Sequence, residues 1–346
     1  MVIGINIVLT VLIIIALIFT LTNGLHDASS VVATFISCRA AKPRQAVLLA
    51  SVFGLIGVLL SGNQVADTVS AIISIAPNEK LLYILIASIL GAVTWNIITW
   101  SKGLPSSSSH ALIGGLVGAT WVSNGSDSIL WGGAELLSSS HQLVGIIKVV
   151  AALIFSPLFG YAAAYIIQKI AFLLLRNSKS SINTSINRLQ WIGAAVLAFS
   201  HGANDSQKIT GLISLAFISS GVANITSIPF PLKFAVGSVM FLGTAFGGWR
   251  IMKTLGREIY DLKPIHSLNS MISSGTSILL ATFAGAPVST THVVVGSIMG
   301  VGAADEYKMV NWNIGKEIVI SWFITIPSAA VCSATIYALI EWRFLL

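Results

Sequence analysis

Charged residues are scarce in this sequence. Asp, Glu, Lys and Arg make up 9% of its 346 residues, whereas 55% are hydrophobic and the mean hydropathy is +0.88. Soluble domains carry about 25% charged residues, so this chain cannot cover a surface that faces water. The segment Val2–Thr22 is free of charge, and about 20 apolar residues are enough to cross a bilayer. The composition excludes a soluble protein and predicts a multi-pass protein of the cell membrane.

Cysteine is equally rare. Cys38 and Cys332 are the only two, and they fit neither a disulfide framework nor a zinc-binding spacing. We interpret both as packing residues. A cleaved signal peptide is disfavoured for the first apolar run, because no basic segment precedes it and no small-residue cleavage site precedes Asn23.

The net charge of +7 would suggest a nucleic-acid partner in a soluble protein, but here Lys and Arg gather in three short loops, 39–44, 176–188 and 250–263. Excess Lys and Arg mark the cytoplasmic side of a membrane protein. Phosphate or lipid binding by these loops is the disfavoured alternative. We expect no nucleic-acid partner and an all-α polytopic membrane protein. Its ten predicted crossings are 2–38 (with a polar break inside), 45–76, 81–101, 105–122, 142–175, 189–222, 231–250, 266–285, 287–303 and 315–340.

The polar, turn-forming segment 176–188 divides the sequence almost in half. We predict a first transmembrane repeat at 1–175, a cytoplasmic linker at 176–188 and a second repeat at 189–346. Five crossings in each half place the second copy upside down in the membrane, as in many secondary transporters with broken or half helices. Counting from the basic loops puts both termini outside the cytoplasm.

The first recurring motif is acidic. The first half contains Asn23-Gly-Leu-His-Asp27, and the second contains His201-Gly-Ala-Asn-Asp205. A carboxylate at membrane depth costs a few kcal/mol, so a cation, a proton or a polar partner must neutralise it. One such Asp could be structural and bonded to backbone amides, but a duplicated pair favours function. Gly24 and Gly202 suggest local unwinding that would free carbonyl oxygens for a cation.

The second motif is rich in hydroxyl groups. Segment 103–110 contains Pro105 and four serines before His110, and segment 285–292 contains Pro287, Ser289, Thr290 and Thr291 before His292. Pro followed by Ser or Thr begins a helix well, but capping explains only one hydroxyl in each motif. Helix N-termini bind anions, so the sequence predicts a small oxyanion between two such helix starts. An anion beside carboxylates requires cations or protons between them.

Three accompanying features leave alternatives open. Downstream glycines, namely Gly114, Gly115, Gly118, Gly296 and Gly300, have the small-xxx-small spacing of close helix packing. His110 and His292 are more consistent with structural hydrogen bonding than with proton transfer, and the four motif histidines lack a zinc spacing. We therefore predict no metal site. Lys208 could pair with Asp205 or extend toward the membrane surface.

Together the motifs closely resemble those of the PiT family of inorganic phosphate transporters. The resemblance spans essentially the whole chain in the correct order and implies symport of phosphate with sodium or protons by an inverted-repeat homodimer, with no cofactor besides the coupling cation. One departure is His26, where the fuller pattern and the second repeat have Asn; it puts a sodium site in the first half in doubt and favours proton coupling or a metal–phosphate substrate. The implied substrate residues are Asp27, Ser107, Ser108, Ser109, Asp205, Ser289, Thr290 and Thr291, and the implied coupling-ion residues are Asp27, Asn204, Asp205 and His26.

Other functions compete with this one. A symporter of sulfate or arsenate would use the same kind of site. An intramembrane hydrolase is disfavoured, because the hydroxyls are duplicated symmetrically and no Gly-x-Ser-x-Gly elbow occurs; we expect no enzyme and no catalytic residue. A divalent-metal channel is the remaining alternative.

Overall fold

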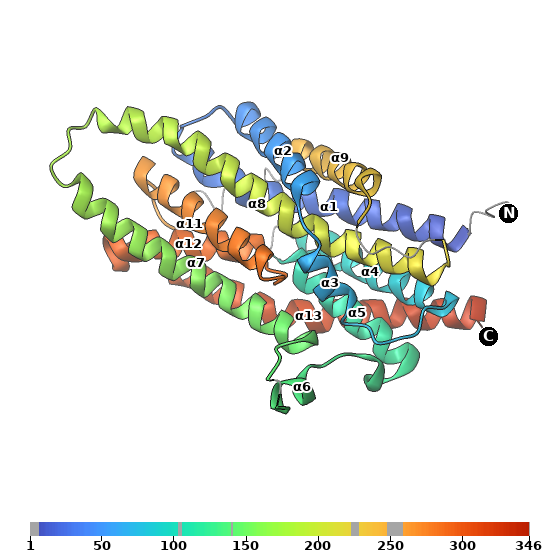
Figure 1. The fold of residues 1–346 in the computed structure, drawn as a ribbon. Helices are drawn as coiled ribbons and strands as arrows, with labels where there is room; N and C mark the ends of the chain where they lie inside the picture. Colours follow the sequence, from blue (N-terminus) through green and yellow to red (C-terminus); the bar gives the residue numbers. More distant parts are fainter. Residues whose placement is uncertain (1–6, 103–105, 140, 223–227, 248–258, 346) are drawn as a thin grey trace.

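The computed structural model describes residues 7–102, 106–139, 141–222, 228–247 and 259–345. Within these ranges every regular element is helical (Figure 1). The prediction of an all-α protein is therefore confirmed for the part of the chain that is described. Pro105 and the basic residues Arg250, Lys253 and Arg257 lie outside the described residues.

The helices follow the ten predicted crossings. In the first half they are α1 (Ile7–Ser37), α2 (Pro43–Leu60), α3 (Gln64–Ser70), α4 (Glu79–Ser101), α5 (Ser108–Asn124), α6 (Gly133–Leu137) and α7 (Gly145–Leu175). In the second half they are α8 (Ile182–Ser219), α9 (Phe230–Phe246), α11 (Pro264–Phe283), α12 (Thr290–Glu306) and α13 (Trp312–Ile340). Short helical turns occupy Ser126–Ser128, Tyr307–Met309 and Glu341–Leu345.

Five of the described helical segments are long and apolar enough to cross a membrane: α1, α2, α4, α7 and the run Trp312–Arg343. Helices α5, α9 and α12 have 17 residues each. Helix α8 is long but more polar, because Asn204, Asp205 and Lys208 are buried in its middle.

Two local predictions were wrong. The crossing predicted at 45–76 is two helices, α2 and α3, separated at Ser61–Asn63. Helix α8 begins at Ile182, inside the predicted linker 176–188, whose place as a boundary stays a prediction. The acidic motifs are not unwound, because α1 and α8 run without interruption through Gly24 and Gly202.

These two glycines serve close helix packing instead. A methyl group at Gly24 would approach the backbone of α9 at Met240, and one at Gly202 would overlap the backbone of α2 at Gly54. Because glycine has no Cβ, α1 can approach α9 closely and α8 can approach α2, so each acidic helix packs against a helix of the other half. Continuous backbone hydrogen bonding leaves the carbonyl oxygens of these turns occupied.

The helices that follow the hydroxyl motifs also pack across the halves. Helix α5 lies against α13, and α12 lies against α7. A methyl group at Gly114 or Gly118 would overlap the backbone of α13, and one at Gly296 or Gly300 the backbone of α7. The predicted small-residue packing is thus confirmed at equivalent positions of both motifs.

Both chain ends lie at one end of the molecule, and the turn between α7 and α8 lies at the opposite end (Figure 1). This arrangement is compatible with a cytoplasmic linker and extracytoplasmic termini. The orientation in the membrane, the inverted relation of the halves and the domain boundaries stay predictions.

Candidate functional site

Two carboxylates from different halves meet inside the molecule. Asp27 on α1 is 2% exposed and Asp205 on α8 is 4% exposed. One oxygen of each lies within 4.8 Å of the other and of a ring nitrogen of His201. Two buried like charges at this distance repel each other strongly, so their surroundings must supply positive charge or protons.

Asp27 is surrounded by hydrogen-bonding groups from three segments. Ser108 Oγ donates to Asp27 Oδ2 at 3.2 Å, and Thr291 Oγ1 donates to Asp27 Oδ1 at 3.0 Å. His26 Nδ1 lies 3.1 Å from the same Oδ1 atom. Among the described residues, no Lys or Arg forms an ion pair with Asp27. This carboxylate is held by one hydroxyl from each hydroxyl motif and by a neighbouring imidazole.

Asp205 differs because a lysine neutralises it. Lys208 Nζ lies 2.5 Å from Asp205 Oδ1, and both side chains are buried. The other carboxylate oxygen, Oδ2, accepts a hydrogen bond from Asn23 Nδ2 at 3.2 Å and lies 3.3 Å from His201 Nδ1. A buried carboxylate with a lysine partner is stable without any further cation.

Lys208 also joins the starts of the two hydroxyl helices. Its ammonium donates to Ser109 Oγ at 2.6 Å and to the carbonyl oxygen of Val288 at 2.7 Å. Ser109 Oγ in turn donates to the same Val288 oxygen at 3.0 Å. One side chain of α8 therefore reaches the N-terminus of α5 and the turn before α12.

Capping uses one hydroxyl in each motif. Ser107 accepts from the backbone N–H of His110 at 3.2 Å, and Ser289 accepts from that of His292 at 3.4 Å. These contacts are N-caps. The remaining hydroxyls of Ser108, Ser109 and Thr291 face the carboxylates or Lys208. Thr290 is buried at 2% exposure. The hydroxyl groups that donate hydrogen bonds to Asp27 are those of Ser108 and Thr291.

Asn204 does not contact either carboxylate in this structure. Its side-chain nitrogen donates to Thr282 Oγ1 at 2.9 Å and to the carbonyl oxygen of Ala286 at 3.1 Å. Its oxygen accepts from the backbone N–H of Val288 at 3.3 Å. Asn204 therefore holds the turn between α11 and α12 in place. Its predicted role toward a coupling ion stays a hypothesis. His26, the other predicted residue beside the acid, does contact the carboxylate of Asp27.

The two histidines that close the hydroxyl motifs meet each other. The rings of His110 and His292 have centroids 5.0 Å apart at an angle of 59°. Both side chains are almost completely buried. Each follows its N-cap by three residues, so this pair links the first turns of α5 and α12.

Asp27, His201 and Asp205 together could hold a metal ion. Carboxylate oxygens and a neutral imidazole nitrogen are ordinary ligands of cations. The sequence interpretation assigned Asp27 and Asp205 to a coupling cation, and His201 is the member of this group that it did not include.

The sequence interpretation also left two residues that contact the carboxylates, Asn23 and Lys208, without an assigned role. Asn23 was readable as the counterpart of His201, since His and Asn exchange places between the two acidic motifs. Lys208 was noticed, but its partner could not be chosen from the sequence. Its position three residues after Asp205 allows a contact within one helical turn.

The profile of the phosphate transporter family matches residues 23–333. The chain belongs to that family. It is therefore a multi-pass protein of the cell membrane, built on the scaffold of a transporter family.

Individual relatives agree with this assignment. A Rhizobium meliloti protein described as a "probable low-affinity inorganic phosphate transporter" is 38% identical over 328 residues, which cover 94% of each chain. A Bacillus subtilis protein of the same description is 36% identical over 97% of this chain and 98% of its own length. A solved structure of a sodium-dependent phosphate transporter has a TM-score of 0.82, 24% identity and coverage of 98% of this chain and 100% of that chain. That likeness establishes a common fold.

Proposed function

We propose that this protein is a secondary symporter that imports inorganic phosphate together with a small cation, sodium or a proton. The observation that carries the proposal is the meeting of two acidic and two hydroxyl motifs around one buried site. Membership of the phosphate transporter family supplies the substrate class. The contacts around Asp27 and Asp205 support the division between anion-binding and cation-binding groups that we propose.

The starts of α5 and α12 offer the chemistry that an oxyanion needs. Free backbone N–H groups in a first helical turn carry partial positive charge and bind phosphate. Hydroxyls of Ser108, Ser109, Thr290 and Thr291 lie in the same two turns and are buried. Lys208 places an ammonium group between them. We assign phosphate binding to these groups, with Ser107 and Ser289 contributing as caps.

The coupling cation is assigned to Asp27. Two carboxylates and one ammonium leave a net charge of −1 in the site when the imidazoles are neutral, and a bound phosphate adds at least one more negative charge. The free energy needed to hold this net negative charge in a low-dielectric interior is too high for phosphate to cross the membrane without an added cation. Asp205 already has Lys208, so the extra positive charge belongs at Asp27, with His26 and His201 available to share a proton.

The test is phosphate uptake into proteoliposomes with sodium and proton gradients imposed separately. We expect one of the two gradients to drive accumulation above the equilibrium level, and the Asp27→Asn variant to lose it. Excess sulfate should not compete with phosphate, whereas arsenate, which has the same shape and charge, should. Uptake that equilibrates but never accumulates under either gradient would contradict symport.

A metal–phosphate complex is the second candidate substrate, because Asp27, His201 and Asp205 could hold a divalent ion. Uptake would then require magnesium or a similar ion outside and carry it inward with phosphate. Phosphate accumulation that is unchanged by a chelator of divalent ions excludes this candidate.

We also propose inverted repeats with both termini outside the cytoplasm, and a homodimer. The exchange of packing partners between halves (α5 with α13, α12 with α7) supports the duplication. Single cysteines placed at each terminus and in 176–181 should be labelled from opposite sides of the membrane in the Cys38→Ala/Cys332→Ala background. Cross-linking in native membranes tests the dimer.

A further inference from the structure

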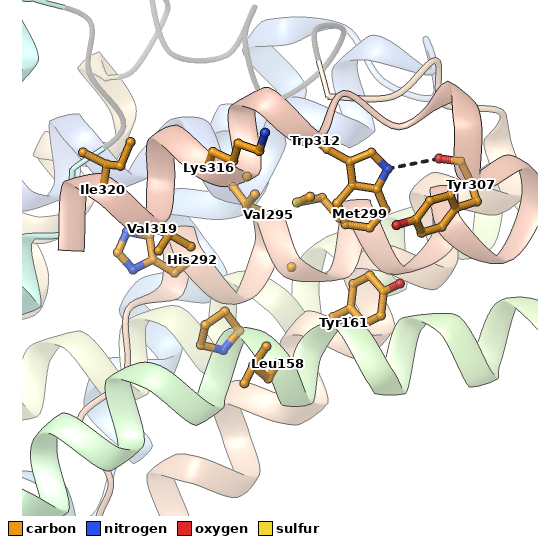
Figure 2. A pocket seen from close by; sticks show the side chains of 13 residues that line it. Leu158, Tyr161, His292, Val295, Met299, Tyr307, Trp312, Lys316, Val319 and Ile320 are labelled. Atoms are coloured by element: carbon orange, nitrogen blue, oxygen red, sulfur yellow. Dashed lines mark hydrogen bonds between the residues drawn. The ribbon is translucent and has the colours of Figure 1, made fainter. Parts of the chain in front are cut away.

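A cleft between α7, α12 and α13 is not used by the site described above. It has a volume of about 850 Å³, within the range of about 300–1,000 Å³ that is usual for ligand sites. Its walls are almost entirely apolar and include Leu158, Val295, Met299, Val319 and Ile320 (Figure 2). Phosphate would lose its hydration there without replacement, so the cleft is unsuited to the transported anion.

Exposed apolar side chains border the open side of the cleft. Leu158 on α7 is 56% exposed, and Val319 and Ile320 on α13 are 43% and 55% exposed. On a membrane-embedded surface, exposed apolar side chains of this kind contact acyl chains. The open side of the cleft therefore faces the bilayer interior.

The aromatic residues with polar atoms gather at one end of the cleft. Tyr307 and Trp312 lie at the turn between α12 and α13, Lys316 lies one helical turn further along α13, and His292 lies toward the other end (Figure 2). Trp312 Nε1 donates to the carbonyl oxygen of Tyr307 at 3.1 Å, and their rings lie 4.7 Å apart. Trp and Tyr are enriched where a membrane protein meets the head-group region. This end of the cleft matches a membrane–water interface.

The length of the cleft matches one leaflet. From His292 to Tyr307 along α12 the distance is roughly 22 Å at 1.5 Å per residue. Half of a bilayer's hydrocarbon core measures about 15 Å, and the aromatic end adds the interfacial layer. An acyl chain that enters at Tyr307 would therefore reach the neighbourhood of His292.

Lys316 is the one charged residue among those that line the cleft. It is exposed, and no carboxylate among the described residues forms an ion pair with it. Glu317 follows it on α13 but does not line the cleft, since consecutive helical residues face different directions. A lysine at the interface end of an apolar cleft complements an anionic lipid head group.

We propose that this cleft binds one anionic phospholipid, with its head group at Lys316 and an acyl chain along Val295, Met299 and Leu158. The site has a direct connection to transport. His292 at its inner end follows Thr291, whose hydroxyl donates to Asp27. A lipid tail packed against α12 stabilises the position of this helix start relative to α1.

Binding is tested with the purified, delipidated protein, so the result does not depend on the proposed transport function. Native mass spectrometry would follow titration with phosphatidylglycerol and, separately, phosphatidylcholine of the same acyl chains. We expect one tightly bound phosphatidylglycerol per chain. We expect the affinity of that site to be about fivefold weaker for phosphatidylcholine and in Lys316→Gln, the size of one lost lysine–lipid interaction.

Two variants separate the apolar part of the site from general effects. Val319→Trp fills the cleft and should remove most of the binding. Val331→Trp makes the same substitution at a residue of α13 that is 66% exposed and outside the cleft, and should bind as the wild type does. Lys169→Gln removes an exposed charge of α7 outside the cleft and should also have no effect.

Equal phosphatidylglycerol binding by the wild type, Lys316→Gln and Val319→Trp would overturn the proposal. Equal affinity for the two lipids would overturn it as well. A change of Val319→Trp from dimer to monomer in the same spectra would show that a second copy of the chain occupies the cleft and would also reject a lipid. Lys316→Gln keeps the test valid if the tryptophan variant does not fold, because Lys316 is at the surface.

Discussion

Asp27 and Asp205 occupy equivalent motifs but have different partners. Asp205 has Lys208 at 2.5 Å, together with Asn23 and His201. Asp27 has two hydroxyls and His26, but no lysine or arginine among the described residues. One of the two buried carboxylates is thus neutralised within the protein, and the other carries the proposed site of the coupling cation.

This difference separates the roles of the two halves. A carboxylate that releases its cation on each transport cycle needs neutral hydrogen-bond donors, which hold it without replacing the cation. A carboxylate that positions a lysine beside an anion needs a fixed ion pair. The two acidic motifs are similar in sequence, and the lysine one helical turn after the second Asp is a main difference between their surroundings.

The largest expected effect is that of Asp27→Asn. A buried pair that loses one partner is weakened by about 3 kcal/mol or more, which corresponds to about 100-fold in cation affinity. Gradient-driven phosphate accumulation should fall to background in proteoliposomes. Membrane insertion and the thermal unfolding midpoint should stay near the wild-type values, and an unstable variant would show that Asp27 is structural.

Lys208→Met should reduce stability more than transport coupling. It leaves Asp205 buried without its cation, at a cost of about 3–5 kcal/mol. The double variant Asp205→Asn/Lys208→Met removes both charges and should recover most of the lost unfolding midpoint in detergent. If the double variant is as unstable as Lys208→Met alone, the ion pair does not explain the role of Lys208.

Substitution of the hydroxyl residues should distinguish those that hold Asp27 from the one that only caps a helix. Ser108→Ala and Thr291→Ala each remove a hydrogen bond to Asp27, worth about 1.5 kcal/mol or more when the acceptor is charged. The half-saturating concentration of the coupling cation should rise about tenfold. Ser107→Ala removes only a cap, at about 1 kcal/mol of stability, and serves as the control. Equal effects of all three variants on the cation would argue that these hydroxyl groups act only on the starts of helices α5 and α12.

His26→Asn should have the smallest effect. It gives the first motif the Asn that precedes the acid in the second motif, and it removes the imidazole 3.1 Å from Asp27. Imidazole is the side chain that ordinarily titrates between about pH 5 and 8. Uptake should be retained within about threefold, with a flatter dependence on pH across that range. An unchanged pH profile would exclude His26 from proton handling.

Much of the fold could be predicted from the sequence. Hydropathy located most of the long helices, and the glycine spacing correctly indicated close packing of α5 and α12. The start of each hydroxyl helix was also readable, since Pro and a run of Ser or Thr favour an N-cap. These features depend on local sequence and need no knowledge of neighbours.

The interpretation of Gly24 and Gly202 failed for a physical reason. Glycine in a helix either permits unwinding or permits close approach of another backbone. Which of the two occurs depends on whether α9 and α2 lie opposite, and that is a property of the folded molecule. The contacts of Asn204, and those of Lys208 with Ser109 and Val288, were unpredictable for the same reason, because these partners lie about 80 or more residues away.

The most direct test of the account compares gradient-driven phosphate accumulation by Asp27→Asn and by Asp205→Asn/Lys208→Met in the same proteoliposomes. The account predicts that Asp27→Asn no longer responds to the coupling gradient. The double variant should still accumulate phosphate in response to that gradient, although with weaker phosphate affinity. Coupling retained by Asp27→Asn and lost by the double variant would contradict the assignment of the transported cation to Asp27.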